Sequence, residues 1–299
     1  MNWKRFKRIF YEEPTSVLAL SGGGARGMAH VGVLQRMDAL SLTPELVTGT
    51  SMGALVGAWY CLHGSSRGFA SVARDLFESD LFEKLDLDEL ISDAEGARDS
   101  FEEFSRKTRT LYTLSKMVRR MSVVEVGFME KVMDRLFGDA TFADLKIPFV
   151  AVATDLYSGE DVALTEGSLG KAVQASASIP GVFPPVALDG KLFVDGYVTK
   201  NVPVPEPGEP PNRAEVMVVD VQRSLASHGP WESGIEVVAR AEWIMQIQMN
   251  RYFLEQADLV LVPEVRDVHW ADFSRIDQLI EAGRQAAVEK EKEIVRLFE

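Results

Sequence analysis

Short apolar runs alternate with helix-like periodicity along most of the chain. Residues 16–20 (SVLAL), 46–48 (LVT) and 147–153 (IPFVAVA) each predict a short buried strand. Each of the first two runs leads into a glycine-containing loop and then a stretch with apolar residues on one helical face, such as Val31 and Leu34 in the first. A repeated strand–loop–helix order predicts a parallel sheet with right-handed crossovers.

The same alternation resumes in the second half of the chain. We expect strands over 192–194, 216–219 and 259–262, and helices over 168–178, 232–255 and 274–298. The proline-rich stretch 203–211 predicts a loop between them. Because no internal repeat is visible, we expect one α/β domain over 16–299, preceded by a separate segment over 1–15.

Residues 65–138 interrupt this alternation. Strand signals nearly vanish there and charged helical segments replace them, which predicts a helical insertion within the domain. A helix over 104–121 has two distinct faces. Its apolar face carries Phe104, Leu111, Leu114, Val118 and Met121, and its basic face carries Arg106, Arg109, Lys116 and Arg120. Our hypothesis is that the insertion forms a lid over the functional site.

Two segments have the composition of a peripheral membrane contact. The helix over 104–121 and the N-terminal stretch 3–11 (WKRFKRIFY) both combine basic residues with apolar or aromatic ones. Basic residues near anionic headgroups contribute about 1 kcal/mol each to membrane binding. An ordinary surface helix and a frayed terminus would have the same composition, so both interpretations stay open.

Overall charge and cysteine content narrow the class of protein. The formal net charge of −13 argues against a general nucleic-acid-binding protein. The single cysteine, Cys61, excludes an intramolecular disulfide and favours a reducing compartment. No apolar run reaches the roughly 20 residues that span a bilayer, and the N-terminal stretch lacks the apolar core of a signal peptide. We therefore expect a cytoplasmic protein.

A serine lies between the second strand and the helix that follows it. The sequence GTSMG at 49–53 fits the G-x-S-x-G turn that exposes a nucleophilic serine above a sheet, here Ser51. Gly49 and Gly53 would allow close packing where a Cβ atom would collide. The same serine could instead be an N-cap residue of the following helix. The pattern alone is weak, and its strand–helix context favours the catalytic interpretation.

A glycine-rich loop, SGGGARG at 21–27, precedes the first helix. Gly22, Gly24 and Gly27 match the dinucleotide-binding pattern G-x-G-x-x-G, but the second strand ends without the carboxylate that would bind ribose. The alternative is an oxyanion hole formed by backbone N–H groups at a helix N-terminus. Because the serine turn stands where the ribose carboxylate is expected, a hydrolase is favoured over a nucleotide-binding oxidoreductase.

A nucleophilic serine needs a proton acceptor. The chain has four histidines, His30, His63, His228 and His269. The hydrolase order serine, aspartate, histidine would require His228 or His269, and neither lies at a strand end. Asp195 ends a short apolar strand and precedes a glycine, so its carboxylate can face the functional edge of the sheet. An ordinary Asp-Gly turn explains the same two residues, and spacing alone favours that explanation.

Taken together, four ordered motifs resemble the patatin-like phospholipase family. They are the loop 21–27 with the following AHVGVL, the serine turn GTSMGA, the segment ASASIPGVFPP at 175–185, and Asp195-Gly196 with Asn201 and Pro203 after it. The resemblance implies a three-layer α/β/α fold with a mostly parallel central sheet and the helical insertion. The sequence departs from the family pattern at Tyr197, where the family usually has glycine or alanine.

The resemblance also implies a reaction. Ser51 would attack an acyl ester, Asp195 would activate it without a histidine, and no metal or cofactor would be needed. The oxyanion loop would comprise Gly22, Gly23, Gly24, Ala25, Arg26 and Gly27. The implied substrates are phospholipids or other acyl esters, as in phospholipase A or lysophospholipase reactions. An acyltransferase or thioesterase would use the same acyl-enzyme, and a binding protein with vestigial catalysis is disfavoured by the intact pair.

Overall fold

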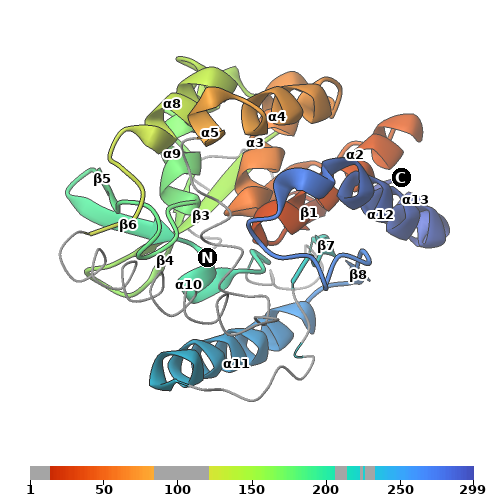
Figure 1. Ribbon diagram of the computed structural model, residues 1–299. Helices are drawn as coiled ribbons and strands as arrows, with labels where there is room; N and C mark the ends of the chain where they lie inside the picture. Colours follow the sequence, from red (N-terminus) through yellow and green to blue (C-terminus); the bar gives the residue numbers. More distant parts are fainter. Residues whose placement is uncertain (1–13, 84–120, 206–213, 223–224, 226–232) are drawn as a thin grey trace.

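The computed structural model describes residues 14–83, 121–205, 214–222, 225 and 233–299 (Figure 1). The strands are β1 (Ser16–Leu20), β2 (Leu46–Thr50), β3 (Phe149–Asp155), β4 (Asp161–Leu164), β5 (Val186–Leu188), β6 (Lys191–Asp195), β7 (Glu215–Val219) and β8 (Leu259–Leu261). The helices are α2 (Ala29–Ala39), α3 (Met52–His63), α4 (Phe69–Phe77), α5 (Asp80–Glu83), α8 (Phe128–Phe137), α9 (Leu169–Ser176), α10 (Tyr197–Lys200), α11 (Gly234–Leu254), α12 (Ile276–Glu289) and α13 (Glu291–Phe298). Three 3₁₀ helices complete the set: η1 (Gly24–Met28), η2 (Phe142–Asp144) and η3 (Phe273–Arg275).

The described strands form one sheet with the order β5-β6-β3-β2-β1-β7-β8, and β4 pairs with β3. The neighbouring pairs β3–β2, β2–β1, β1–β7 and β7–β8 are parallel. The pairs β3–β4, β3–β6 and β5–β6 are antiparallel. The predicted mostly parallel sheet is therefore confirmed, and an antiparallel edge is added to it. β1, β2 and β3 are buried along their whole length, as expected for parallel strands covered on both faces.

Helices cover both faces of the sheet, as Figure 1 shows. Helices α2, α3, α8 and α12 pack over one face around the larger apolar core. The smaller core on the opposite face, which includes Val17, Val150 and Val218, is packed by Phe253 and Leu254 of α11. The three-layer α/β/α arrangement is confirmed.

The register of β3 brings two distant parts of the chain together. β2 pairs with the first part of β3, ending at Thr50 opposite Val152. β6 pairs with the next part, starting at Asp195 opposite Ala153. β4 pairs with the same stretch of β3. Because a strand has only two edges for pairing, β2 and β6 must both lie along the edge of β3 opposite β4. The ends of β2 and β6 therefore meet at one point on β3.

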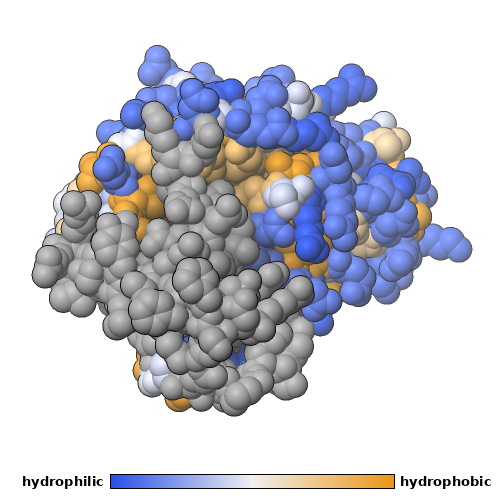
Figure 2. All heavy atoms as spheres, viewed as in Figure 1, coloured by the Kyte–Doolittle hydropathy of each residue, from blue (hydrophilic) through white to orange (hydrophobic). Residues whose placement is uncertain are grey.

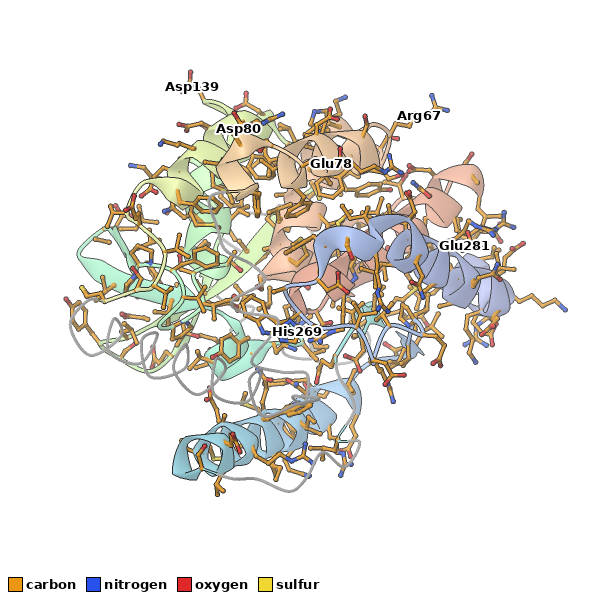
Figure 3. The ribbon with its side chains drawn as sticks, viewed as in Figure 1. Arg67, Glu78, Asp80, Asp139, His269 and Glu281 are labelled. Carbon is orange, nitrogen blue, oxygen red and sulfur yellow. The ribbon has the colours of Figure 1, made fainter. Side chains whose placement is uncertain are left out.

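Within the described part of the predicted insertion, three segments are helical, whereas residues 121–127 are not. Helices α4, α5 and α8 come from residues 65–83 and 121–138, and the predicted helix over 104–121 lies outside the described residues except for its last residue. The exposed charged residues Arg67, Glu78 and Asp139 lie on the turns next to these helices (Figure 3). Figure 2 shows apolar side chains gathered beneath them.

Helices α2 and α12 cross at glycines. A Cβ atom at Gly32 would collide with the backbone of Ile280 and Arg284, and one at Gly283 with the backbone of Ala29. Because neither helix backbone can yield as a side chain would, this crossing requires both glycines.

We expect Gly283→Ala to lower the free energy of unfolding by about 3 kcal/mol or more, because the added methyl group forces α12 off α2. Thermal denaturation followed by circular dichroism measures the effect. Gly234→Ala is the matched control, since a Cβ atom there meets nothing within 4 Å. An equal loss in both variants would contradict the proposed crossing.

Candidate active site

Ser51 occupies a strained turn between β2 and α3. Its backbone has φ 55° and ψ −123°, a conformation that costs a non-glycine residue about 1–3 kcal/mol. A Cβ atom at Gly49 would lie 2.6 Å from the Ala54 Cα atom, and one at Gly53 would collide with the Leu20 carbonyl. The Ser51 side chain makes no capping hydrogen bond to α3, so helix capping does not explain this serine.

The hydroxyl of Ser176 holds the turn in place. The backbone N–H of Ser51 donates to Ser176 Oγ at 3.0 Å, and that hydroxyl donates to the Val152 carbonyl at 2.6 Å. Ser176 is fully buried at the end of α9, so water cannot replace this bond. One side chain therefore links the candidate nucleophile to β3.

Asp195 lies at the end of β6, where the register of β3 places it beside the end of β2. Its side chain is fully buried, and Oδ1 accepts a hydrogen bond of 2.9 Å from the Tyr197 N–H. Burial raises the pKa of this carboxyl to about 7, while hydrogen bonding from Ser51 and from the Tyr197 amide lowers it. A carboxyl with a pKa near neutrality is suited to general acid–base chemistry.

The second carboxylate oxygen has no settled partner. Asp195 Oδ2 is buried and accepts no hydrogen bond of ordinary geometry from the described residues. The nearby Ser51 hydroxyl still lowers the pKa of the carboxyl, although the two side chains do not form a hydrogen bond of ordinary geometry. Long or poorly aligned hydrogen bonds are common between catalytic groups when no substrate is bound.

The segment after α9 positions the aspartate as well as the serine. The Asp195 N–H donates to the Ser178 carbonyl at 2.9 Å, and the Gly196 N–H donates to the Ser176 carbonyl at 3.3 Å. A Cβ atom at Gly196 would collide with the Val152 carbonyl. The motif ASASIPGVFPP therefore supplies a support for both candidate catalytic residues.

The glycine-rich loop borders Ser51, and its amides differ in their partners. The Gly22 N–H donates to the Asn201 carbonyl at 3.1 Å, and the Ala25 N–H donates to the Trp270 carbonyl at 2.6 Å. For the N–H groups of Gly23 and Gly24, no acceptor exists in the described part of the chain. Gly24 has φ +58°, which turns the chain into η1.

The last residues of the loop serve the packing. The Arg26 guanidinium is buried and donates to the carbonyls of Val221 and Val268, each at 3.0 Å. A Cβ atom at Gly27 would collide with the Met52 side chain. Of the six residues predicted for the oxyanion loop, only Gly23 and Gly24 combine a position beside Ser51 with an N–H that lacks a described acceptor.

Two cavities meet at Ser51. The larger, of about 550 Å³, has a mixed lining that includes Asp195 and the first three glycines of the loop, Gly22–Gly24. The smaller, of about 90 Å³, has an almost wholly apolar lining beneath α4, α5 and α8, the region in Figure 2 where apolar side chains gather. Both cavities are lined by Gly24, Ser51, Ile179, Val182 and Trp270. The serine is therefore accessible from a polar and an apolar side.

None of the described histidines lines either cavity. His30 is buried with Nε2 2.8 Å from the Ser21 carbonyl, and burial lowers its pKa to about 4. His63 stacks on Trp59, and His269 lies on the loop between β8 and η3 (Figure 3), where its Nδ1 accepts from the Ala271 N–H. His228 lies outside the described residues.

Several residues around the site carried no local signal in the sequence. Trp270, Gln222 and Glu242 line the larger cavity from segments far along the chain. The described residues contain no group of three or more His, Cys, Asp or Glu side chains placed to bind a metal ion. Within the same residues, no helix has the length and apolarity needed to cross a membrane.

Comparison with known proteins shows what the chain is similar to. The family model described as patatin-like phospholipase matches residues 18–207. An uncharacterized NTE family protein of Mycobacterium tuberculosis is 30% identical over 194 residues, covering 64% of this chain and 45% of that protein. Patatin-like phospholipase domain-containing protein 6 of Mus musculus is 27% identical over 260 residues, covering 85% of this chain and 16% of its own length. The chain thus spans less than half the length of these relatives.

Solved structures show a weaker likeness. VipD from Legionella pneumophila has a TM-score of 0.47 and 14% identity, covering 94% of this chain and 67% of that one. ExoU of Pseudomonas aeruginosa, in its complex with SpcU, has a TM-score of 0.47 and 16% identity, covering 95% and 52%. The family model, by contrast, spans well over half of the 299 residues and includes both Ser51 and Asp195. The chain belongs to the patatin-like phospholipase family.

Proposed function

We propose that the chain hydrolyses acyl ester bonds of lipids, with Ser51 as nucleophile and Asp195 as its proton acceptor. The observation that carries the proposal is the position of Ser51. It stands on a strained turn where an apolar and a mixed cavity meet, beside a buried carboxyl whose pKa is about 7. Membership of the patatin-like phospholipase family supports a carboxylic ester as the substrate.

The proposed reaction has two halves. Asp195 takes the proton of the Ser51 hydroxyl as Oγ attacks the ester carbonyl, and the N–H groups of Gly23 and Gly24 stabilise the oxyanion. The tetrahedral intermediate then collapses, the C–O bond of the ester breaks, and Asp195 returns the proton to the departing alcohol. Water attacks the acyl-enzyme in the same way, giving up a proton to Asp195, which passes it back to Ser51.

The apolar cavity is suited to the acyl chain of the substrate. Its lining includes Leu55, Ala73, Leu136 and Phe183, together with aromatic rings in contact with one another, such as Phe77 and Phe82 at a centroid distance of 4.7 Å. Burial of each additional methylene group is worth about 0.8 kcal/mol, so long-chain esters gain more from this cavity than short ones.

We expect Ala73→Leu to lower the ratio of kcat/KM for p-nitrophenyl decanoate to that for the butyrate about tenfold, because the larger side chain fills the cavity. Ala70→Leu on the same helix is the control, since Ala70 does not line the cavity. If Ala73→Leu leaves the ratio unchanged, the acyl chain binds elsewhere.

Ser176→Ala should reduce kcat about 10- to 100-fold, with a small change in KM, because the Ser51 N–H loses its buried acceptor and the turn shifts. Ser16→Ala is a matched control, since Ser16 Oγ also accepts a backbone N–H, from Glu45 at 3.4 Å, but far from the site. Equal kcat values in wild type and Ser176→Ala would show that the Ser51 turn keeps its position without the hydrogen bond to Ser176.

The proposed function is tested by a series of p-nitrophenyl esters from acetate to dodecanoate, together with a monoacyl and a diacyl phospholipid. We expect turnover that increases with chain length and release of free fatty acid from at least one lipid. No turnover of any ester by the folded protein would contradict the proposal. Peripheral membrane contact through the segments 3–11 and 104–121 stays a prediction, because both lie almost entirely outside the described residues.

A further inference from the structure

The wall of the larger cavity has two origins. Ser51, Asp195 and the glycine-rich loop lie within residues 18–207, the span that the family model matches. The remaining lining lies beyond that span: Gln222, Ala239, Glu242, Trp243, Gln246 and Trp270. Helix α11 contributes four of these six residues. The part of the chain after residue 207 therefore shapes the space beside Ser51 and Asp195.

Tyr197 connects the two parts of this wall. Its N–H donates to Asp195 Oδ1 at 2.9 Å, and its hydroxyl donates to Glu242 Oε1 at 3.2 Å. The Gln246 side chain donates to the Tyr197 carbonyl at 3.4 Å. Burial and the charges of Glu242 and Asp195 raise the pKa of the Tyr197 phenol, so it remains a donor. The residue that departs from the family pattern thus donates a hydrogen bond to Glu242, a solvent-exposed carboxylate of α11 that lines the cavity.

The charged residues that line this cavity differ in their partners. Among its described lining residues, the acids are Asp195 and Glu242 and the basic residue is Arg26. The Arg26 guanidinium donates to two backbone carbonyls and interacts with the charge of Asp220. Arg240, two residues before Glu242, projects about 200° away around the helix and stacks on the Trp243 ring at 5.0 Å. Arg240 does not itself line the cavity, so Glu242 is the one charged residue that α11 contributes to the described lining.

We propose that Glu242, held by Tyr197, selects esters whose leaving alcohol is cationic or neutral and discriminates against an anionic alcohol. This proposal rests on the proposed function: if the acyl chain occupies the apolar cavity, the leaving alcohol lies in the larger cavity, which Ser51 also lines. A carboxylate in the lining of the cavity attracts a cationic alcohol and repels a phosphate, most strongly at low ionic strength. The aromatic rings of Trp270 and Tyr197 offer further contact surface to a quaternary ammonium group.

Three decanoyl esters test the proposal: those of choline, glycerol and glycerol 3-phosphate, which carry a cationic, a neutral and an anionic alcohol. At low ionic strength, kcat/KM of wild type should be about tenfold or more higher for the choline ester than for the glycerol phosphate ester. Glu242→Gln keeps a hydrogen-bond acceptor for Tyr197 and removes the charge, so this ratio should fall about fivefold. Glu255→Gln, the same change at the exposed end of α11, should leave it unchanged.

Binding to the Ser51→Ala protein, measured by calorimetry with the same esters below their micellar concentrations, tests selectivity without cleavage. Tighter binding of the choline ester, weakened by Glu242→Gln, supports the proposal even if wild type hydrolyses none of the three. Equal or tighter binding of the anionic ester, or a ratio that Glu242→Gln does not change, overturns it. Hydrolysis that depends on Ser51 but shows no charge preference would overturn this selectivity while leaving the proposed function intact.

Discussion

Ser51→Ala should lower kcat/KM for every ester by about 10⁴-fold or more, because no other hydroxyl stands where the two cavities meet in the described part of the chain. The loss should be the same for short and long acyl chains, since the substitution removes the nucleophile and leaves both cavities in place. Initial rates on the p-nitrophenyl series, with the uncatalysed rate subtracted, measure it.

The fold of this variant should be intact. The Ser51 side chain makes no capping bond, and the bond that holds the turn is donated by the backbone N–H, which alanine retains. Circular dichroism and the melting temperature should therefore match wild type closely. Turnover that survives Ser51→Ala in a folded protein would show that a different group attacks the ester.

Asp195→Asn should lower kcat/KM by about 10³-fold or more, because an amide cannot take the proton of Ser51. In wild type, kcat/KM should rise about tenfold per pH unit below pH 7 and level off above it, as the carboxyl with a pKa of about 7 loses its proton. The residual activity of the variant should lack this titration. A wild-type profile that is flat from pH 5 to 8 would exclude Asp195 as the base.

The same substitution should stabilise the protein at high pH. The pKa of Asp195 is about 7 in the folded state and 3.8 as the ordinary value, so between these values the folded state alone holds the proton. Wild type therefore loses stability as the pH rises through this window, by a few kcal/mol and at most about 4. Asparagine does not titrate, so the melting temperature of Asp195→Asn should exceed that of wild type increasingly from pH 5 to pH 8.

Much of the fold could be predicted from apolar runs. The strands β1, β2, β3 and β7 are buried on both faces apart from the exposed Glu215, so each contains a short apolar run that is easy to recognise. β4 and β5 were not predicted, since they are short, partly exposed and specified by their partners rather than by their own residues. The helix predicted over 274–298 is divided at Lys290 into α12 and α13.

The candidate site was predictable in its residues but not in its geometry. Ser51 and Asp195 follow from motifs, yet only the register of β3 shows that β2 and β6 end beside each other. The hydrogen bond from the Ser51 N–H to Ser176 Oγ connects the serine turn to a residue of α9 that lies 125 positions later. A local sequence pattern cannot predict a contact between such distant residues. Glu242 and Trp270 reach the cavity through packing of the C-terminal part, which no motif describes.

The central claim, that Ser51 is the single activated nucleophile of this site, is tested most directly by a fluorophosphonate probe. Such a probe forms a stable bond to a serine only where a base and an oxyanion hole activate it. Peptide mapping of the labelled protein should find one adduct, on Ser51, absent in Ser51→Ala and formed much more slowly in Asp195→Asn. An adduct on another residue, or none on the folded wild-type protein, would contradict the account.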